Sequence, residues 1–128
     1  MVFAKGHSQV LGVGAHFPVQ TVSSRDLMEE IGSEWRFGIG TDWLEHNMGV
    51  VERRYADDDT LPSDMATVAA EEAIRNAGID IGDIGALVFA GIDRDNEEPG
   101  TAHVVQCNIG AFNAKCVDIT NACHQPLI

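Results

Sequence analysis

The spacing of apolar residues predicts helices where these residues recur every three or four positions, and buried strands where they run together. The clearest helical pattern covers residues 63–77, where the apolar positions are Met65, Val68, Ala69, Ala73, Ile74 and Ala77. A shorter pattern predicts a helix over residues 101–109. Gly78 and Gly110 follow these two patterns, and glycine is a common residue just after a helix. A third helix is predicted over residues 26–31, with Ser23 or Ser24 as its cap.

Three short apolar runs, at residues 10–15, 84–91 and 116–120, predict strands. They are continuous rather than alternating, which is typical of strands buried on both faces of a parallel sheet. The alternation of strands and helices favours an α/β domain with a mostly parallel central sheet. Glycines interrupt residues 32–59, and we expect a loop-rich excursion there with a short helix over 43–47. Without a repeat or a Pro/Gly/Ser-rich linker, the chain is interpreted as one unit.

The charge of the chain narrows the possible partners. Eight Lys and Arg stand against twenty Asp and Glu, which gives a formal net charge of −12. Such an acidic surface repels a phosphate backbone, so we expect no nucleic-acid partner. No apolar run approaches the roughly 20 residues that span a bilayer, and the first residues do not have the pattern of a secretion signal. These features predict a cytoplasmic protein with no membrane partner.

The three cysteines, Cys107, Cys116 and Cys123, raise the question of a reactive thiol. Their number is odd and no Cys-x-x-Cys pair occurs, which fits neither a disulfide framework nor a standard zinc site. We therefore expect no metal and no bound cofactor. Cys107 and Cys116 lie within a predicted helix and strand, and both are interpreted as core residues.

Cys123 differs because it follows directly on the last predicted strand. The carboxyl ends of parallel strands are where α/β folds usually hold their reactive groups. A helix beginning at or just after Cys123 would stabilise the thiolate and lower its pKa below about 8.5. That placement predicts a nucleophile for acyl groups, and without further context the alternative is an inert buried thiol.

Several segments, in this order and spacing, resemble one known family from about residue 10 onward. They are residues 11–18, 43–54, 77–84 and 99–111 and the run from Asp118 to Cys123. The family is that of the thiolase-like condensing enzymes, and within it the β-ketoacyl-[acyl-carrier-protein] synthase III group. The resemblance implies that residues 1–128 form the N-terminal, nucleophile-bearing half of a thiolase-like fold, part of an αβαβα layered architecture. The second half, which carries a His and an Asn in this family, is expected to be absent from the chain.

The resemblance also implies a reaction. Cys123 would take an acyl group from acyl-coenzyme A or an acyl carrier protein, followed by decarboxylative condensation or by transfer to another acceptor. The chain is thus expected to belong to an acyltransferase of fatty acid or polyketide biosynthesis, inactive as an isolated 128-residue piece. A homodimer and a C-terminal half, in the same or another chain, are the expected protein partners.

Three departures from the family concern the substrate. Trp43 matches a family tryptophan, but Asn47 stands where members that use coenzyme A commonly have an Arg. Glu98 replaces an apolar residue that reaches the acyl pocket of the partner subunit, and a carboxylate there would disfavour a long alkyl chain. Residues 124–126, His-Gln-Pro, replace a small residue and a Gly after the cysteine. Trp43, Asn47 and Glu98 are the predicted substrate-binding residues.

Three other functions stay open. The departures fit a non-catalytic assembly module that keeps the fold. An enzyme like hydroxymethylglutaryl-coenzyme A synthase also has an Asn-Ala-Cys segment, but its general-base Glu is matched here only by the neighbourhood of Gly91, Ile92 and Asp93. A redox or metal protein built on Cys123, His124 and His103 would need a ligand spacing that the chain does not have.

Overall fold

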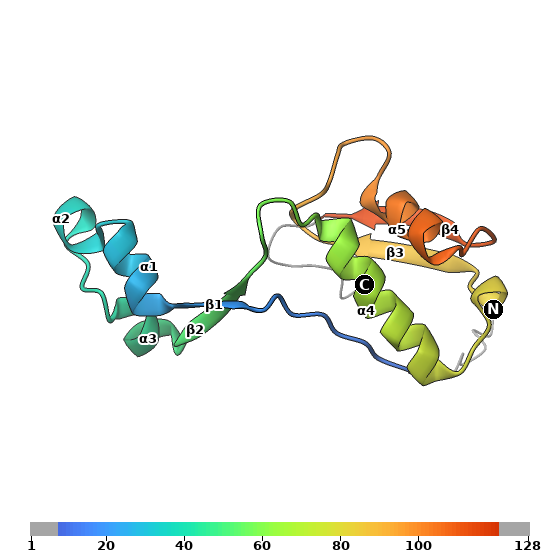
Figure 1. Ribbon diagram of the computed structural model, residues 1–128, viewed down its shortest axis with the longest axis horizontal. Helices are drawn as coiled ribbons and strands as arrows, with labels where there is room; N and C mark the ends of the chain where they lie inside the picture. Colours follow the sequence, from blue (N-terminus) through green and yellow to red (C-terminus); the bar gives the residue numbers. More distant parts are fainter. Residues whose placement is uncertain (1–7, 121–128) are drawn as a thin grey trace, which may run out of the picture. The chain divides into compact units, whose positions relative to one another are not determined.

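The structure, a computed structural model, describes residues 8–120 in two compact units (Figure 1). Residues 17–59 form one unit, and residues 8–16 together with 60–120 form the other. The sequence pattern predicted a single unit, because the glycine-interrupted stretch was interpreted as an excursion rather than as a body with its own contacts. None of the helices within residues 8–120 is long and apolar enough to cross a membrane.

The unit of residues 17–59 contains one antiparallel pair of strands and three short helices. Strand β1 (Gln20–Ser23) pairs with β2 (Glu52–Tyr55), and α1 (Ser24–Glu30), α2 (Ser33–Phe37) and α3 (Trp43–Met48) lie between them in the chain. The predicted helices at 26–31 and 43–47 are confirmed by α1 and α3. Helix α2 and both strands were not predicted.

Local backbone chemistry sets the limits of these short elements. The Ser23 hydroxyl accepts a hydrogen bond from the Asp26 amide at 3.0 Å and thereby caps α1, as the sequence suggested. Gly32 and Gly38 flank α2 with φ angles of 67°, a left-handed conformation that favours glycine. The glycines that made this stretch look like loop therefore separate genuine helices.

The second unit carries the predicted α/β pattern. Its elements are α4 (Pro62–Ala77), the 3₁₀ turn η1 (Ile81–Asp83), β3 (Ala86–Ala90), α5 (Thr101–Ile109) and β4 (Lys115–Ile119). Strands β3 and β4 pair in parallel, with Leu87 opposite Cys116 and Phe89 opposite Asp118. The two main helices, the last two strands and their parallel pairing are confirmed.

The apolar core of this unit lies between α4, α5 and one face of β3. Val105, Ile109, Ala111 and Ala114 are buried, and residues of α4 and β3, including Ile74 and Leu87, pack against them. Burial of a side chain such as Val105 or Ile109 stabilises the fold by roughly 1.5–3 kcal/mol. The opposite face of the sheet is open, since Val88 and Val117 are 53% and 50% exposed, so the predicted burial on both faces is not observed.

The predicted strand at residues 10–15 is wrong. This segment has no regular secondary structure, and Val10 is 80% exposed. Within residues 8–120 no strand pairs with it, so its backbone is held by side chains of α4 instead. Glu72 accepts a hydrogen bond from the Ala15 amide at 2.8 Å, and Asn76 donates to the Val13 carbonyl at 2.8 Å.

Candidate functional site

The predicted nucleophile, Cys123, lies outside the described residues, as does its neighbour His124. Its placement at a corner between a strand and a helix stays a prediction. The structure does describe β4, which ends at Ile119, four positions before Cys123. The contacts around the end of β4 therefore fix the point from which the chain continues toward Cys123.

Asp118 joins the end of β4 to the start of α5. The Thr101 amide donates to Oδ2 of Asp118 and the Ala102 amide donates to Oδ1, both at 2.7 Å. These two amides belong to the first turn of α5, where backbone N–H groups have no partner within the helix. One carboxylate thus satisfies two buried donors, and hydrogen bonds of a charged acceptor are the stronger kind.

Gly100, the residue just before α5, allows this close approach. A β-carbon at position 100 would lie 2.9 Å from Oδ2 of Asp118 and 3.1 Å from its Cγ. Side chains essentially never pack at that distance, so a larger residue would displace the carboxylate. The φ angle of Gly100 is −60°, which any residue can adopt. Glycine is therefore required here by the lack of space for a side chain and not by the backbone conformation.

Asp95 extends the same network to α4. Its Oδ1 accepts a hydrogen bond from the Ser63 amide at 3.0 Å, and its own amide donates to the Thr101 hydroxyl at 3.4 Å. Ser63 and Thr101 are both fully buried. The loop between β3 and α5 is therefore tied at one point to the first turns of both helices.

An open groove of about 350 Å³ lies beside this network. It is lined by Glu97, Glu98, Pro99, Gly100, His103 and Asp118. Glu98, one of the predicted substrate-binding residues, is exposed and precedes Pro99 through a cis peptide bond. Three of the six lining residues carry carboxylates, so the groove attracts positive or hydrogen-bond-donating groups more readily than anions.

The other two predicted substrate-binding residues, Trp43 and Asn47, share helix α3 in the unit of residues 17–59. Trp43 is 42% exposed, and the Asn47 side chain donates a hydrogen bond to the Trp43 carbonyl at 3.0 Å. The structure thus brings these two together, one turn apart on one helix. The amide of Asn47 faces its own backbone and carries no charge, unlike the Arg expected at this place.

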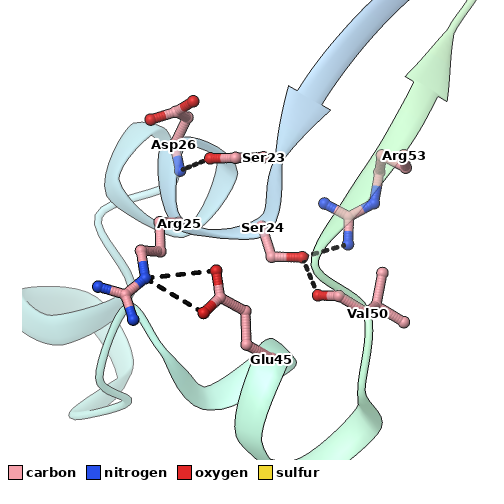
Figure 2. A network of polar contacts seen from close by, with 7 residues as sticks. All are labelled: Ser23, Ser24, Arg25, Asp26, Glu45, Val50 and Arg53. Atoms are coloured by element: carbon pink, nitrogen blue, oxygen red, sulfur yellow. Dashed lines mark hydrogen bonds and ion pairs between the residues drawn. The ribbon is translucent and has the colours of Figure 1, made fainter.

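A polar network holds α3 beside α1 and β2 (Figure 2). The hydroxyl of Ser24, which is fully buried, donates to the Val50 carbonyl and accepts from Nη2 of Arg53 at 3.3 Å. Nε of Arg25 pairs with the Glu45 carboxylate at 3.2 Å. These contacts are not visible in the apolar pattern, and the only sequence signal for them is a pair of serines before a helix.

The two described cysteines differ from each other. Cys107 is exposed, so its predicted place in the core is wrong. The buried stripe of α5 consists of Thr101, Ala102, Val105 and Ile109, and position 107 lies off that stripe. Cys116 is half-buried. Burial raises the pKa of its thiol, and the nearby Cys107 and Asp118 act in the same direction. Among residues 8–120 no three His, Cys, Asp or Glu side chains are arranged to hold a metal ion.

Comparison with known proteins gives relatives of one kind. No family model matches the sequence. The chain is 34% identical over 114 residues to the "Beta-ketoacyl-[acyl-carrier-protein] synthase III" of Geobacillus kaustophilus, covering 89% of this chain and 35% of the relative. The protein of the same name from Clostridium botulinum is 36% identical, with 89% of this chain and 33% of the relative covered. The chain thus spans about a third of the length of these curated relatives.

Comparison with solved structures finds proteins of the same kind. The 3-oxoacyl-(acyl carrier protein) synthase III, FabH, of Xanthomonas oryzae matches with a TM-score of 0.79 and 36% identity, over 89% of this chain and 34% of that one. A variant of OleA from Xanthomonas campestris matches with a TM-score of 0.79 and 35% identity, over 90% of this chain and 34% of that one. By sequence and by fold, the chain is similar to about a third of the length of these β-ketoacyl-[acyl-carrier-protein] synthase III and OleA proteins, and it matches an α/β part of their thiolase-like fold.

Proposed function

We propose that this chain carries the nucleophile of an acyl-transferring condensing enzyme, with Cys123 as the acyl acceptor. The observation that carries the proposal is the 34% identity over 89% of the chain to a synthase of this group. Strand β4 of this chain ends four positions before Cys123. The parallel pairing of β3 with β4 supports the proposal, because reactive groups of α/β folds gather where parallel strands end.

The proposed step is a thioester exchange. The Cys123 thiolate attacks the carbonyl carbon of an acyl thioester, the bond from that carbon to the leaving sulfur breaks, and the departing thiolate takes up a proton. This exchange is nearly isoenergetic, so the protein mainly supplies a thiol of low pKa and donors for the transient oxyanion. The acyl group then passes to a carbanion formed by decarboxylation or to another acceptor.

We assign the donor as acyl-coenzyme A or an acyl carrier protein, with no bound cofactor. Trp43 would form a wall of the donor site, and Asn47 would make a weaker contact with a phosphate than an Arg, since it lacks a charge. Glu98, which the resemblance directs to the acyl pocket of the partner subunit, would disfavour a long alkyl chain there. The His and Asn that complete the reaction would come from a C-terminal half, and the assembly would be a homodimer in the cytoplasm.

Intact-mass measurement of the complete enzyme, this chain together with its C-terminal half, after incubation with acyl-coenzyme A thioesters tests the nucleophile. We expect a mass gain equal to one acyl group in the unmodified protein and in Cys107→Ala, the matched control at an exposed thiol. The gain should vanish in Cys123→Ala. An adduct that persists in Cys123→Ala would refute the assignment.

A second candidate is a non-catalytic module that pairs with an active partner. It is favoured by Asn47, whose side chain is already bonded to the Trp43 carbonyl rather than free for a phosphate. This candidate predicts that no acyl adduct forms at any thioester concentration, even though Cys123 can be alkylated by iodoacetamide.

A further inference from the structure

A small open cavity lies between the end of α1 and the start of α2, within the unit of residues 17–59. Its volume is about 170 Å³, and both helices line it, with Glu29 from α1 and Ser33, Glu34 and Trp35 from α2. The buried side chain of Met28 adds an apolar surface. None of these residues belongs to the proposed acyl-transfer site, so the cavity is a separate feature of the chain.

Ser33 supplies a hydroxyl group without a partner. The residue is 1% exposed, and within residues 8–120 no group forms a hydrogen bond with its Oγ. An unpaired buried polar group costs about 1–3 kcal/mol, and most such groups in native structures have a partner. Because Ser33 lines the cavity, a group bound there is the candidate partner for this hydroxyl.

Two carboxylates make the cavity negative. Glu29 lies in the last turn of α1 and Glu34 in the first turn of α2, and neither takes part in an ion pair among residues 8–120. The last turn of α1 has no basic residue, although the C-terminal end of a helix favours cations over anions. The charge of the cavity and the unbalanced end of α1 both favour a positively charged ligand.

Trp35 forms an aromatic wall of the cavity. Its ring lies against Gly32, where a β-carbon would be only 2.0 Å from Nε1, so a larger residue would displace the ring. The guanidinium of Arg36 lies over the ring, with Cζ 5.2 Å from the centroid, which is the range of a cation–π contact. The indole thus already interacts with one guanidinium. The charge of Arg36 repels a second cation, but the two carboxylates outnumber it.

The arrangement of these groups fits an organic cation better than a metal ion. Among residues 8–120 no three His, Cys, Asp or Glu side chains are placed to hold one ion. A guanidinium is planar, offers five N–H donors in fixed directions and stacks on aromatic rings, so it can serve several separate acceptors at once. An ammonium group is a compact, strongly hydrated point charge and matches separate acceptors less well.

We propose that the cavity between α1 and α2 binds a guanidinium group. The carboxylates of Glu29 and Glu34 and the hydroxyl of Ser33 are the acceptors, and the indole of Trp35 is the wall. The guanidinium is that of a small free compound or of an arginine side chain of a partner protein, two sources that present the same chemical group. This site does not depend on Cys123 or on the proposed acyl transfer.

Fluorine NMR tests the proposal on the complete enzyme, this chain together with its C-terminal half, labelled with 5-fluorotryptophan. The signal of Trp35 is identified by its loss in Trp35→Phe. We expect this signal to shift in a saturable way when ethylguanidinium chloride is added at constant ionic strength. Ethylurea has a similar shape without the charge, and it should cause no saturable shift.

Substitutions of the lining residues locate the site. Glu29→Gln and Glu34→Gln should each raise the Kd of ethylguanidinium by about threefold to fivefold, the effect of an exposed charge pair. Ser33→Ala should raise the Kd by about threefold without lowering the Tm, because it removes a hydroxyl that has no partner in the free protein. Glu30→Gln is the matched control, since Glu30 is the next carboxylate of α1 and does not line the cavity. It should change the Kd by less than about twofold, because solvent and salt screen its charge.

A saturable shift that weakens in Glu29→Gln, Glu34→Gln and Ser33→Ala but not in Glu30→Gln supports the proposal. An amidated tripeptide with arginine between two glycines separates the two sources. Tighter binding of the peptide than of ethylguanidinium indicates a partner protein, and equal or weaker binding indicates a free compound. The proposal is overturned if no saturable shift occurs, if ethylurea acts equally, or if Glu30→Gln weakens binding as much as the substitutions of the lining carboxylates. A Ser33→Ala variant with a lower Tm and an unchanged Kd would overturn the role of Ser33 as an acceptor.

Discussion

Different kinds of contact stabilise the interior of each of the two units of this chain. In residues 60–120 the two main helices bury an apolar cluster around Val105 and Ile109. In residues 17–59 most large apolar side chains are exposed, Trp35 by 80%, and the buried contacts centre on Ser24 and its polar partners. The periodic pattern of apolar residues therefore predicts the structure of residues 60–120 well and that of residues 17–59 poorly.

The largest expected effect is the loss of a core side chain in the apolar unit. Ile109→Ala should lower the free energy of unfolding by about 2–5 kcal/mol, because it removes buried methyl groups and leaves a cavity. Trp35→Ala, a larger truncation at an exposed site, should change the free energy of unfolding by no more than about 0.5 kcal/mol. Urea denaturation followed by circular dichroism measures both. Equal losses would mean that Trp35 is covered in solution.

The next effect concerns residues 8–16, which lie on α4 through backbone contacts rather than through apolar side chains. A β-carbon at Gly14 would lie 2.1 Å from the Ala69 carbonyl oxygen and 2.5 Å from the Ala73 amide nitrogen. Gly14→Ala should therefore cost about 1–3 kcal/mol, as overpacking usually does. Hydrogen exchange should show faster exchange of the Ala15 amide, which is bonded to Glu72.

Gly85→Ala is the matched control for that substitution. Nothing lies within 4 Å of a β-carbon at Gly85, and its backbone is not in the left-handed region. This variant should leave the stability and the exchange of residues 8–16 unchanged. If both variants were equally harmless, the segment would not pack closely on α4.

Ser24→Ala tests the polar unit. The substitution leaves the partly buried Val50 carbonyl without its side-chain donor and Nη2 of Arg53 without its acceptor, at a cost of about 1–3 kcal/mol. We expect faster hydrogen exchange across β1, β2 and α1, with α4 and α5 unaffected. Arg25→Ala, which breaks the exposed pair with Glu45, should cost about 1 kcal/mol or less. Exchange that accelerates equally in α5 would show that the two units unfold together.

These differences explain how much could be predicted from the sequence. Helices α4 and α5 and strands β3 and β4 were predicted because each buries an apolar face, and the cap at Ser23 identified α1. Strands β1 and β2 were missed because their residues, Gln-Thr-Val-Ser and Glu-Arg-Arg-Tyr, are mostly polar and lie largely exposed. The apolar run at 10–15 has the composition of a strand, but secondary structure also needs a neighbour to pair with, and the run itself does not reveal one.

The residues of the candidate site could likewise be predicted from the sequence only in part. The predicted residues Trp43, Asn47 and Glu98 came from the resemblance, and the structure places the first two on one helix and the third in a groove. Asp118 was not singled out, since its bonds to Thr101 and Ala102 join residues 17 and 16 positions apart. Such contacts depend on the three-dimensional meeting of a strand end with a helix start, which no local periodicity encodes.

The smallest effect distinguishes two thiols of the apolar unit. A raised pKa leaves Cys116 with less thiolate at a given pH, and the thiolate is the form that reacts, so Cys116 should be alkylated more slowly than the exposed Cys107 at pH 8.

Because the folded protein favours the neutral thiol, the contribution of Cys116 to stability is fully present below the pKa of an unfolded cysteine, about 8.5, and is lost as the pH rises through the higher folded value. Unfolding free energies measured between pH 7 and pH 10 should therefore fall less in Cys116→Ser, which does not titrate in this range, than in the unmodified protein. An identical pH slope in the unmodified protein and in Cys116→Ser would show that burial at position 116 does not act on the thiol.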